Sequence, residues 1–120
     1  MPVKSFNIIS KNKIHSFNKS IIVDSDKSIS IRSFLLGAIS ENITLASNVL
    51  ESEDVLNSLK SIRKLGISYK KINNYYEIHG LGLSGYNPRK NITIDAGNSG
   101  TFARLILGLL VNSNHEITLI

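Results

Sequence analysis

The sequence predicts an α/β (α+β) fold in which helices pack on a sheet. Short runs rich in β-branched residues alternate with longer stretches whose apolar residues recur at helical spacing. Clusters of Gly and Asn separate these stretches, as turn residues do. An alternation of strands and helices is typical of domains in which each helix buries its apolar face against a sheet.

The first half of the chain predicts strands on both sides of a helix. Residues 5–10, 19–23 and 43–47 are short runs of apolar and β-branched side chains, which is typical of strands. Residues 28–40 instead space their apolar side chains as a helix does, and a polar pair ends this helix. We therefore expect the order strand, strand, helix, strand.

The next predicted helix has the clearest signals in the sequence. Ser52 is a good N-cap, and Glu53 and Asp54 lie in the first turn, where a helix is positive. Gly66 suits the position just after the last turn, where many helices end in a left-handed conformation. Between these signals, one helix face is apolar: Val55, Leu56, Leu59, Ile62 and Leu65.

The second half predicts a hairpin and then a strand–helix–strand segment. Residues 67–72 and 75–79 alternate as strands around a turn at Asn73–Asn74, and the Gly-rich residues 80–88 form a loop. A strand over 91–95, a helix through 102–110 and a strand over 116–120 complete the prediction. The chain ends inside that strand without terminating polar residues, which indicates truncation.

Composition limits the class of protein. The chain has 120 residues, 42% of them hydrophobic and 19% charged, which suits one globular domain. No apolar run is long enough for a membrane span, and the N-terminus has no apolar signal core. Without Cys there are no disulfides, zinc thiolates or thiol nucleophiles, and these features fit a cytoplasmic protein without a membrane partner.

The charge of the chain points to an anionic partner. The net charge is +5, and both nucleic acid and small phosphorylated substrates are candidates. Proteins that bind single-stranded nucleic acid interleave basic and aromatic residues. Here the Lys and Arg residues are scattered and show no such interleaving. We therefore expect no nucleic acid, although a basic nucleic-acid-binding α/β module remains an alternative.

The first candidate site lies where the strand at 19–23 meets the helix at 28–40. Backbone N–H groups at a helix N-terminus lack partners and, with the helix dipole, attract anions. Lys27 adds an ammonium, Ser28 a hydroxyl and Arg32 a guanidinium on the same helix face as Ser28. These residues could clamp a phosphate or carboxylate; the commoner explanation, on local sequence alone, is a serine N-cap with solvated charges.

Residues 95–104, with the sequence DAGNSGTFAR, form a second junction of the same kind. Glycines such as Gly100 let the backbone approach a ligand closely, and Asn98, Ser99 and Thr101 can cap the helix or bind an anion. Arg104 lies one turn inside the helix. A structural cap, and a surface ion pair for Arg104, are the commoner explanations, but two such junctions in one basic chain favour an anion site.

The histidines and the hairpin tyrosines are explained more simply by structural roles than by a role in catalysis or binding. His15, His79 and His115 are isolated and lack the spacing of metal ligands, so we expect no metal site. The tyrosines of the predicted hairpin alternate with apolar residues, so we expect them to pack rather than to stack on bases.

Together the two junctions resemble a known family. The stretches DKSISIR, SNVLESEDV and GNSGTFAR stand in the order and spacing found in the N-terminal part of the EPSP synthases, or 3-phosphoshikimate 1-carboxyvinyltransferases. The resemblance covers nearly the whole chain. The sister enolpyruvyl transferases that act on UDP-N-acetylglucosamine have Lys-Asn where this chain has Lys27–Ser28, which makes them the second choice.

The resemblance implies a fold and a division of the chain. The family consists of βαβαββ units in an inside-out α/β barrel, with three units in each of two domains and the active site between the domains. Residues 1–120 would be the N-terminal part, with the first unit at 19–80 and the start of the next at 91–120. The remainder of the enzyme, including the acid/base carboxylates of its second domain, would lie outside this chain, and the parent would be monomeric.

The resemblance also implies a reaction without a metal or organic cofactor. The 5-hydroxyl of shikimate 3-phosphate would attack C2 of phosphoenolpyruvate, and phosphate would leave from a tetrahedral intermediate, in the biosynthesis of chorismate and aromatic amino acids. A fragment of this size would be inactive by itself.

The matching positions receive roles from the resemblance. Lys27 would touch both substrates as the catalytic residue, Ser28 and Arg32 would hold shikimate 3-phosphate, and Asn98 and Gly100 would line the phosphoenolpyruvate site. Thr101 and Arg104 would support them, as would Asp54, for which a role at a helix terminus is an equal alternative. A single site requires Lys27 and Gly100 to lie at two helix N-termini facing one cleft.

The first junction departs from the family in its turn. Val23-Asp24-Ser25-Asp26 precede Lys27 where the family commonly has Pro-Gly, and Ile31 replaces a polar residue. Asp24 and Asp26 are unfavourable beside an anion unless they point outward.

Overall fold

The structure is a computed structural model that describes residues 9, 16, 18–85, 88 and 90–120. The described elements are, in chain order, α1 (Lys27–Ile39), β1 (Ile43–Ser47), α2 (Glu53–Lys64), β2 (Ser68–Ile72), β3 (Tyr75–His79), α3 (Gly82–Gly85), β4 (Ile92–Ile94), α4 (Gly100–Leu110) and β5 (Ile117–Leu119). The predicted α/β class is confirmed, and the described strands form two separate sheets rather than a closed barrel.

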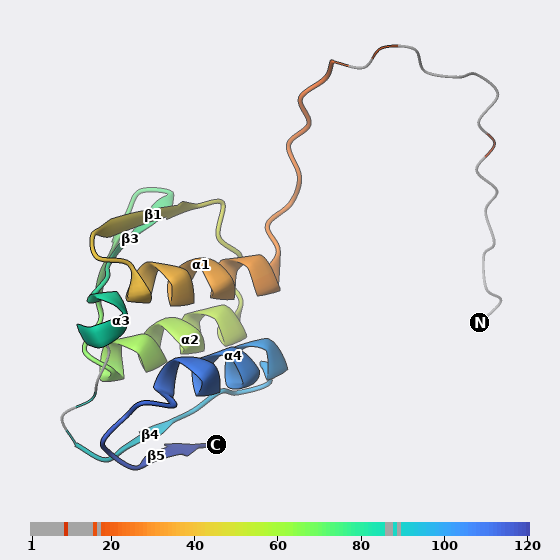
Figure 1. The fold of residues 1–120 in the computed structure, drawn as a ribbon. Coiled ribbons are helices and arrows are strands. Elements are labelled where there is room, and N and C mark those ends of the chain that lie inside the picture. The colour runs from red at the N-terminus through yellow and green to blue at the C-terminus, as the bar shows by residue number, and fades with distance from the viewer. Residues whose placement is uncertain (1–8, 10–15, 17, 86–87, 89) are drawn as a thin grey trace, which may run out of the picture.

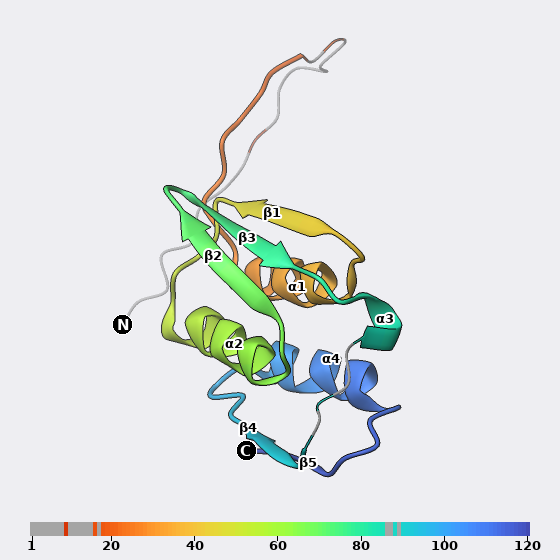
Figure 2. The same ribbon diagram turned by 90° about the vertical axis from the view of Figure 1, so that its left-hand side faces the viewer.

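The larger sheet has the strand order β1-β3-β2, with antiparallel neighbours (Figure 2). β2 and β3 form the predicted hairpin, and Asn73 in its turn has a φ of 52°, a conformation that Asn tolerates better than most residues. β1 pairs with the other side of β3, with Ala46 opposite Tyr76. Among the described residues, β1 is therefore an edge strand.

The smaller sheet contains the second strand–helix–strand segment. β4 and β5 are parallel, with Ile94 opposite Leu119, and α4 connects them. Parallel strands need such a crossover because the chain must return to the same end of the sheet.

The three long helices lie side by side with their N-termini at the same end of the molecule (Figure 1). α1 contacts β1 and β3 of the larger sheet, and also α2 and α4. α1 has neighbours on several sides and therefore buries a broad face: Ser30, Ile31, Phe34, Leu35, Gly37 and Ala38. None of the helices that the structure describes has the length and apolar character needed to cross a bilayer.

Tyr76 joins the larger sheet to the helices. Its ring meets Phe34 edge to face, with 5.5 Å between the ring centroids. Its hydroxyl donates to Oε1 of Glu51 at 2.7 Å, and burial raises the pKa of Tyr76 to about 12. The predicted packing role of the hairpin tyrosines is confirmed at this position.

The strand predicted over residues 19–23 is wrong. These residues have no regular secondary structure, and the side chains of Ile21 and Ile22 are 78% and 101% exposed. A strand needs a neighbour that pairs with its backbone, and a β-branched composition alone does not supply one.

Smaller differences concern a loop and two helix starts. Residues 82–85 form the short helix α3 inside the predicted loop, and α1 begins one residue earlier than predicted. Ser52 is the N-cap residue of α2 as predicted, but its side chain makes no capping hydrogen bond. The strand predicted over 5–10 lies outside the described residues, apart from residue 9.

Candidate functional site

The first junction forms the N-terminal end of α1. Asp26 is the N-cap, and its Oδ1 accepts a hydrogen bond from the Ile29 N–H at 2.7 Å. The alternative of a serine N-cap at Ser28 is therefore wrong. The Asp26 carboxylate already accepts a hydrogen bond from one of the N–H groups that an incoming anion would use. Lys27 and Ser28 extend toward neighbouring helices.

Lys27 reaches from α1 to α2. Its Nζ donates to Oδ2 of Asp54 at 3.0 Å, and the two side chains are 42% and 21% exposed. An ion pair this exposed contributes little to stability, so its main effect is to hold the ammonium at the shared end of the helices. Asp54 thus lies at a helix terminus and also contacts the predicted clamp.

Ser28 and Thr101 join the two junctions. The Ser28 Oγ lies 3.4 Å from Oγ1 of Thr101, in the first turn of α4, although 73 positions separate the two residues. Either hydroxyl can donate. The two junctions therefore lie side by side, as a single site requires, while a cleft between them stays a prediction.

The second junction turns sharply before α4. Gly97 has a φ of 53°, which favours glycine, and its N–H donates to Oδ1 of Asp95 at 2.7 Å. A Cβ at this position would lie 3.6 Å from Oδ1 of Asp54 and 3.4 Å from Nδ2 of Asn57. The turn therefore packs against the start of α2, and three helix N-termini meet.

α4 begins with a neutral cap. Ser99 is buried, and its Oγ accepts a hydrogen bond from the Phe102 N–H at 3.1 Å. A Cβ on Gly100 would lie 3.2 Å from Nη1 of Arg104, so the missing side chain lets the guanidinium fold back over the helix start. Asn98, just before the cap, is exposed.

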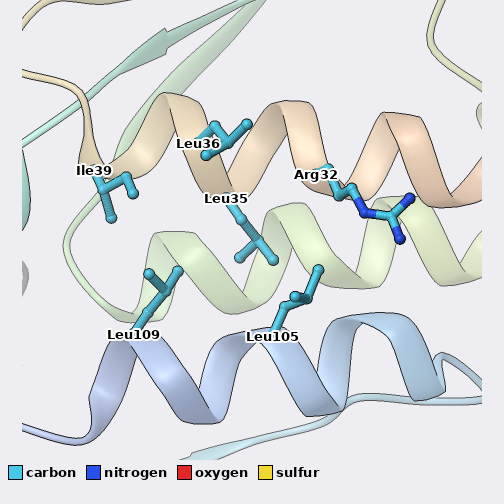
Figure 3. A pocket seen from close by; sticks show the side chains of 6 residues that line it. All are labelled: Arg32, Leu35, Leu36, Ile39, Leu105 and Leu109. Carbon is cyan, nitrogen blue, oxygen red and sulfur yellow. The ribbon is translucent and has the colours of Figure 1, made fainter.

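Arg32 lies at one end of an apolar groove between α1 and α4. Figure 3 shows its guanidinium pointing away from the aliphatic side chains and toward the N-terminal ends of both helices. Arg32 is exposed, and the ion pairs found in the described part of the chain do not include it. The other residues that line this groove of about 200 Å³ are Leu35, Leu36, Ile39, Leu105 and Leu109.

Sequence reasoning missed two neighbours of the site. Asn57 lies three residues after Asp54, a spacing that places both on one face of α2 and could have revealed it. Asp26 directly precedes the helical residues, which is a common N-cap signal, whereas the sequence-based prediction treats it only as an unfavourable charge.

The arrangement can bind a multiply charged anion. Three helix N-termini contribute positive potential, and Lys27, Arg32 and Arg104 add charged donors. Asp26 and Asp54 offset part of this charge. In the described ranges, no group of His, Asp and Glu side chains is placed to hold a metal ion.

Comparison with known proteins identifies the family. The model of the family described as EPSP synthase (3-phosphoshikimate 1-carboxyvinyltransferase) matches residues 11–120. The 3-phosphoshikimate 1-carboxyvinyltransferase of Alkaliphilus oremlandii is 41% identical over 108 residues, which cover 90% of this chain and 25% of that protein. The 3-phosphoshikimate 1-carboxyvinyltransferase of Bacillus cytotoxicus is 43% identical over 103 residues, which cover 86% of this chain and 24% of that protein.

Solved structures agree with this result. An EPSP synthase from Acinetobacter baumannii superposes with a TM-score of 0.66 at 36% identity, over 82% of this chain and 23% of that one. The chain spans about a quarter of the length of these relatives. With a family match over nearly all of its residues, and with the family's two junctions meeting at one end of its helices, this chain belongs to the EPSP synthase family.

Proposed function

We propose that this chain supplies part of the active site of an enzyme that transfers the enolpyruvyl group of phosphoenolpyruvate to the 5-hydroxyl of shikimate 3-phosphate. The observation that carries the proposal is the contact between Ser28 and Thr101, which brings the two family motifs together. Both substrates are polyanions, and the site gathers cations and helix N-termini.

The first junction would bind shikimate 3-phosphate. Arg32 can offer its planar donors to the phosphate, and Ser28 can donate its hydroxyl from one turn earlier on the same helix face. The exposed guanidinium already points toward the shared helix ends (Figure 3).

The second junction would bind phosphoenolpyruvate. Asn98 and the backbone at Gly100 would face this substrate, while Thr101 and Arg104 support them. The neutral Ser99 cap supports this assignment, because it places no negative charge at the start of α4. Lys27 would contact both substrates, with Asp54 holding its ammonium in place.

The proposed reaction is redox-neutral and balances without a further reactant. The oxygen of the 5-hydroxyl bonds to C2 of phosphoenolpyruvate while C3 gains a proton and the hydroxyl loses one. The tetrahedral intermediate then loses a proton from C3 and expels phosphate, which restores the double bond. Lys27 would offset substrate charge as it develops, and the acid and base would come from the remainder of the enzyme.

We extend the proposal to the organisation of the parent enzyme. Residues 19–80 would form one βαβαββ unit of the parent, and 91–120 would begin the next. The first strand of the unit at 19–80 is not formed in this chain alone, so it would have to pair with a strand of the remainder of the enzyme. The larger sheet with α1 and α2, and the separate β4–α4–β5 segment, support this division. A monomeric, cytoplasmic enzyme remains the expectation.

A chimera tests the proposal. Residues 11–120 would replace the matching segment of the Alkaliphilus oremlandii relative, and phosphate release would be measured with phosphoenolpyruvate and shikimate 3-phosphate. We expect turnover comparable to that of the relative, and none when UDP-N-acetylglucosamine replaces shikimate 3-phosphate. A folded chimera that is inactive, or that prefers the nucleotide sugar, would refute the proposed function.

The 120-residue chain alone provides a further prediction. We expect it to release no phosphate, because one partial domain cannot close around both substrates or supply the proton transfers. The same assay checks this prediction, and turnover near that of the chimera would show that these residues hold a complete site.

A further inference from the structure

Two buried serines lie behind the candidate site and are not explained by substrate contacts. We propose that Ser30 and Ser61 are positioning residues, whose hydroxyls fix the three backbone segments that present the substrate-binding groups. This inference rests on the proposed function. Neither serine faces a substrate in it, and both link one element to another.

Ser30 connects the start of α1 with the segment that leads into α2. Its Oγ donates to the Asp26 carbonyl at 2.6 Å and accepts from the Leu50 N–H at 3.0 Å. The residue is 4% exposed. Asp26 adjoins Lys27, and Leu50 lies four residues before Asp54, so one hydroxyl sets the spacing of the two segments whose side chains form the Lys27–Asp54 ion pair.

Ser61 makes the equivalent link on the other side of α2. Its Oγ donates to the Asp95 carbonyl at 3.1 Å, and the residue is 3% exposed. Asp95 begins the turn that contains Gly97 and Asn98 and leads into α4. The Ser61 hydroxyl therefore fixes the second junction relative to α2.

The other contacts across the site are weaker as positional restraints. The Lys27–Asp54 pair is partly exposed, and the Ser28–Thr101 contact is long at 3.4 Å. A buried hydroxyl that loses its partner leaves a desolvated polar group, so buried hydrogen bonds hold their geometry more firmly. A site of this kind loses rate when its groups shift by a fraction of an ångström.

Ser58 provides a matched control. It lies on the same helix as Ser61 and is 1% exposed, but its Oγ donates to the Val55 carbonyl within α2, at 2.6 Å. Ser58→Ala thus deletes an equally buried hydroxyl without cutting a link between elements.

The test measures KM for each substrate and kcat in the chimera with Ser30→Ala, Ser61→Ala or Ser58→Ala. Ser30→Ala removes the hydrogen bonds of this hydroxyl with Asp26 and Leu50, and it should raise the KM for shikimate 3-phosphate about two- to tenfold. Ser61→Ala should raise the KM for phosphoenolpyruvate by a similar factor. Ser58→Ala should leave both KM values unchanged, even if it lowers the melting temperature.

The outcomes separate this inference from the proposed function. An active chimera in which all three variants keep wild-type KM values would overturn the positioning roles and leave the proposed function intact. An inactive wild-type chimera would overturn both. If Ser30→Ala does not fold, Ser30→Cys keeps a similar shape with a weaker acceptor and gives the same readout. Equal KM changes in the Ser58 variant would show a general loss of packing and also refute the proposal.

Discussion

The two junctions both lead into a helix but differ in how they could attract an anion. At the first, the carboxylate of Asp26 caps α1, and the positive groups are side chains, Lys27 and Arg32. At the second, the hydroxyl of Ser99 caps α4, and glycines leave the backbone accessible. The first junction therefore depends on charged side chains, whereas the second combines the conformation of its backbone with one charged side chain, Arg104.

This difference predicts that the junctions will respond to different substitutions. Removing a side-chain charge should weaken the first junction, whereas adding a Cβ should disturb the second. The predictions below test this contrast, from the largest expected effect to the smallest.

Arg32→Ala should have the largest effect on binding. In the chimera, we expect shikimate 3-phosphate to bind more weakly by about 2–4 kcal/mol, because a charge-assisted phosphate contact is lost. Calorimetry measures the dissociation constant. Arg63→Ala removes the same charge at the opposite end of α2 and serves as the control. Unchanged affinity in the Arg32 variant would remove this residue from the site.

Gly97→Ala should act through the backbone. The φ of 53° disfavours any residue with a Cβ, so we expect the free energy of unfolding to fall by about 1–2 kcal/mol. Urea unfolding of the 120-residue chain measures this loss. In the chimera, the KM for phosphoenolpyruvate should rise while that for shikimate 3-phosphate changes little.

Gly108→Ala is the matched control for that substitution. Gly108 lies inside α4, and a Cβ there would meet no atom within 4 Å. We expect the free energy of unfolding of this variant to rise by about 0.5–1 kcal/mol, because alanine has a higher helix propensity than glycine. Equal destabilisation of both variants would show that the positive φ of Gly97 does not make it more sensitive to an added Cβ than Gly108 inside the helix.

Asp26→Ser should have the smallest effect, and it makes the first junction resemble the second. Serine caps a helix about as well as aspartate, so the free energy of unfolding should stay unchanged. The loss of a carboxylate near the helix N-terminus should tighten shikimate 3-phosphate binding by about 0.3–1 kcal/mol in calorimetry. Glu41→Gln changes the same charge just beyond the other end of α1 and controls for net charge. Weaker binding in Asp26→Ser would show that the carboxylate helps the site.

The elements with local signals could be predicted from the sequence. α2 has its acidic first turn, its apolar face and Gly66, which adopts a φ of 95° just past its end. The hairpin at Asn73 was equally local. The strand expected over 19–23 failed because pairing depends on a distant neighbour, which composition does not reveal.

The site was predictable only in part, for the same reason. Candidate anion-binding residues could be proposed at each junction because caps, glycines and basic side chains are local features. The family resemblance predicts that the two junctions meet, but it does not identify Ser28 and Thr101 as the pair that makes the contact. The contacts of Ser30 with Leu50, and of Ser61 with Asp95, depend on packing between elements, and a lone serine in a helical pattern does not indicate them.

The parallel alignment of α1, α2 and α4 has a thermodynamic consequence (Figure 1). Helix dipoles that point the same way repel one another, and their positive ends crowd together here. A polyanionic ligand would relieve this repulsion and so act as a counterion for the fold itself. By linkage, a ligand at a hundred times its dissociation constant adds about 2.7 kcal/mol to stability. Phosphate-bearing ligands should therefore raise the melting temperature in proportion to their charge, and high salt should narrow the differences between them.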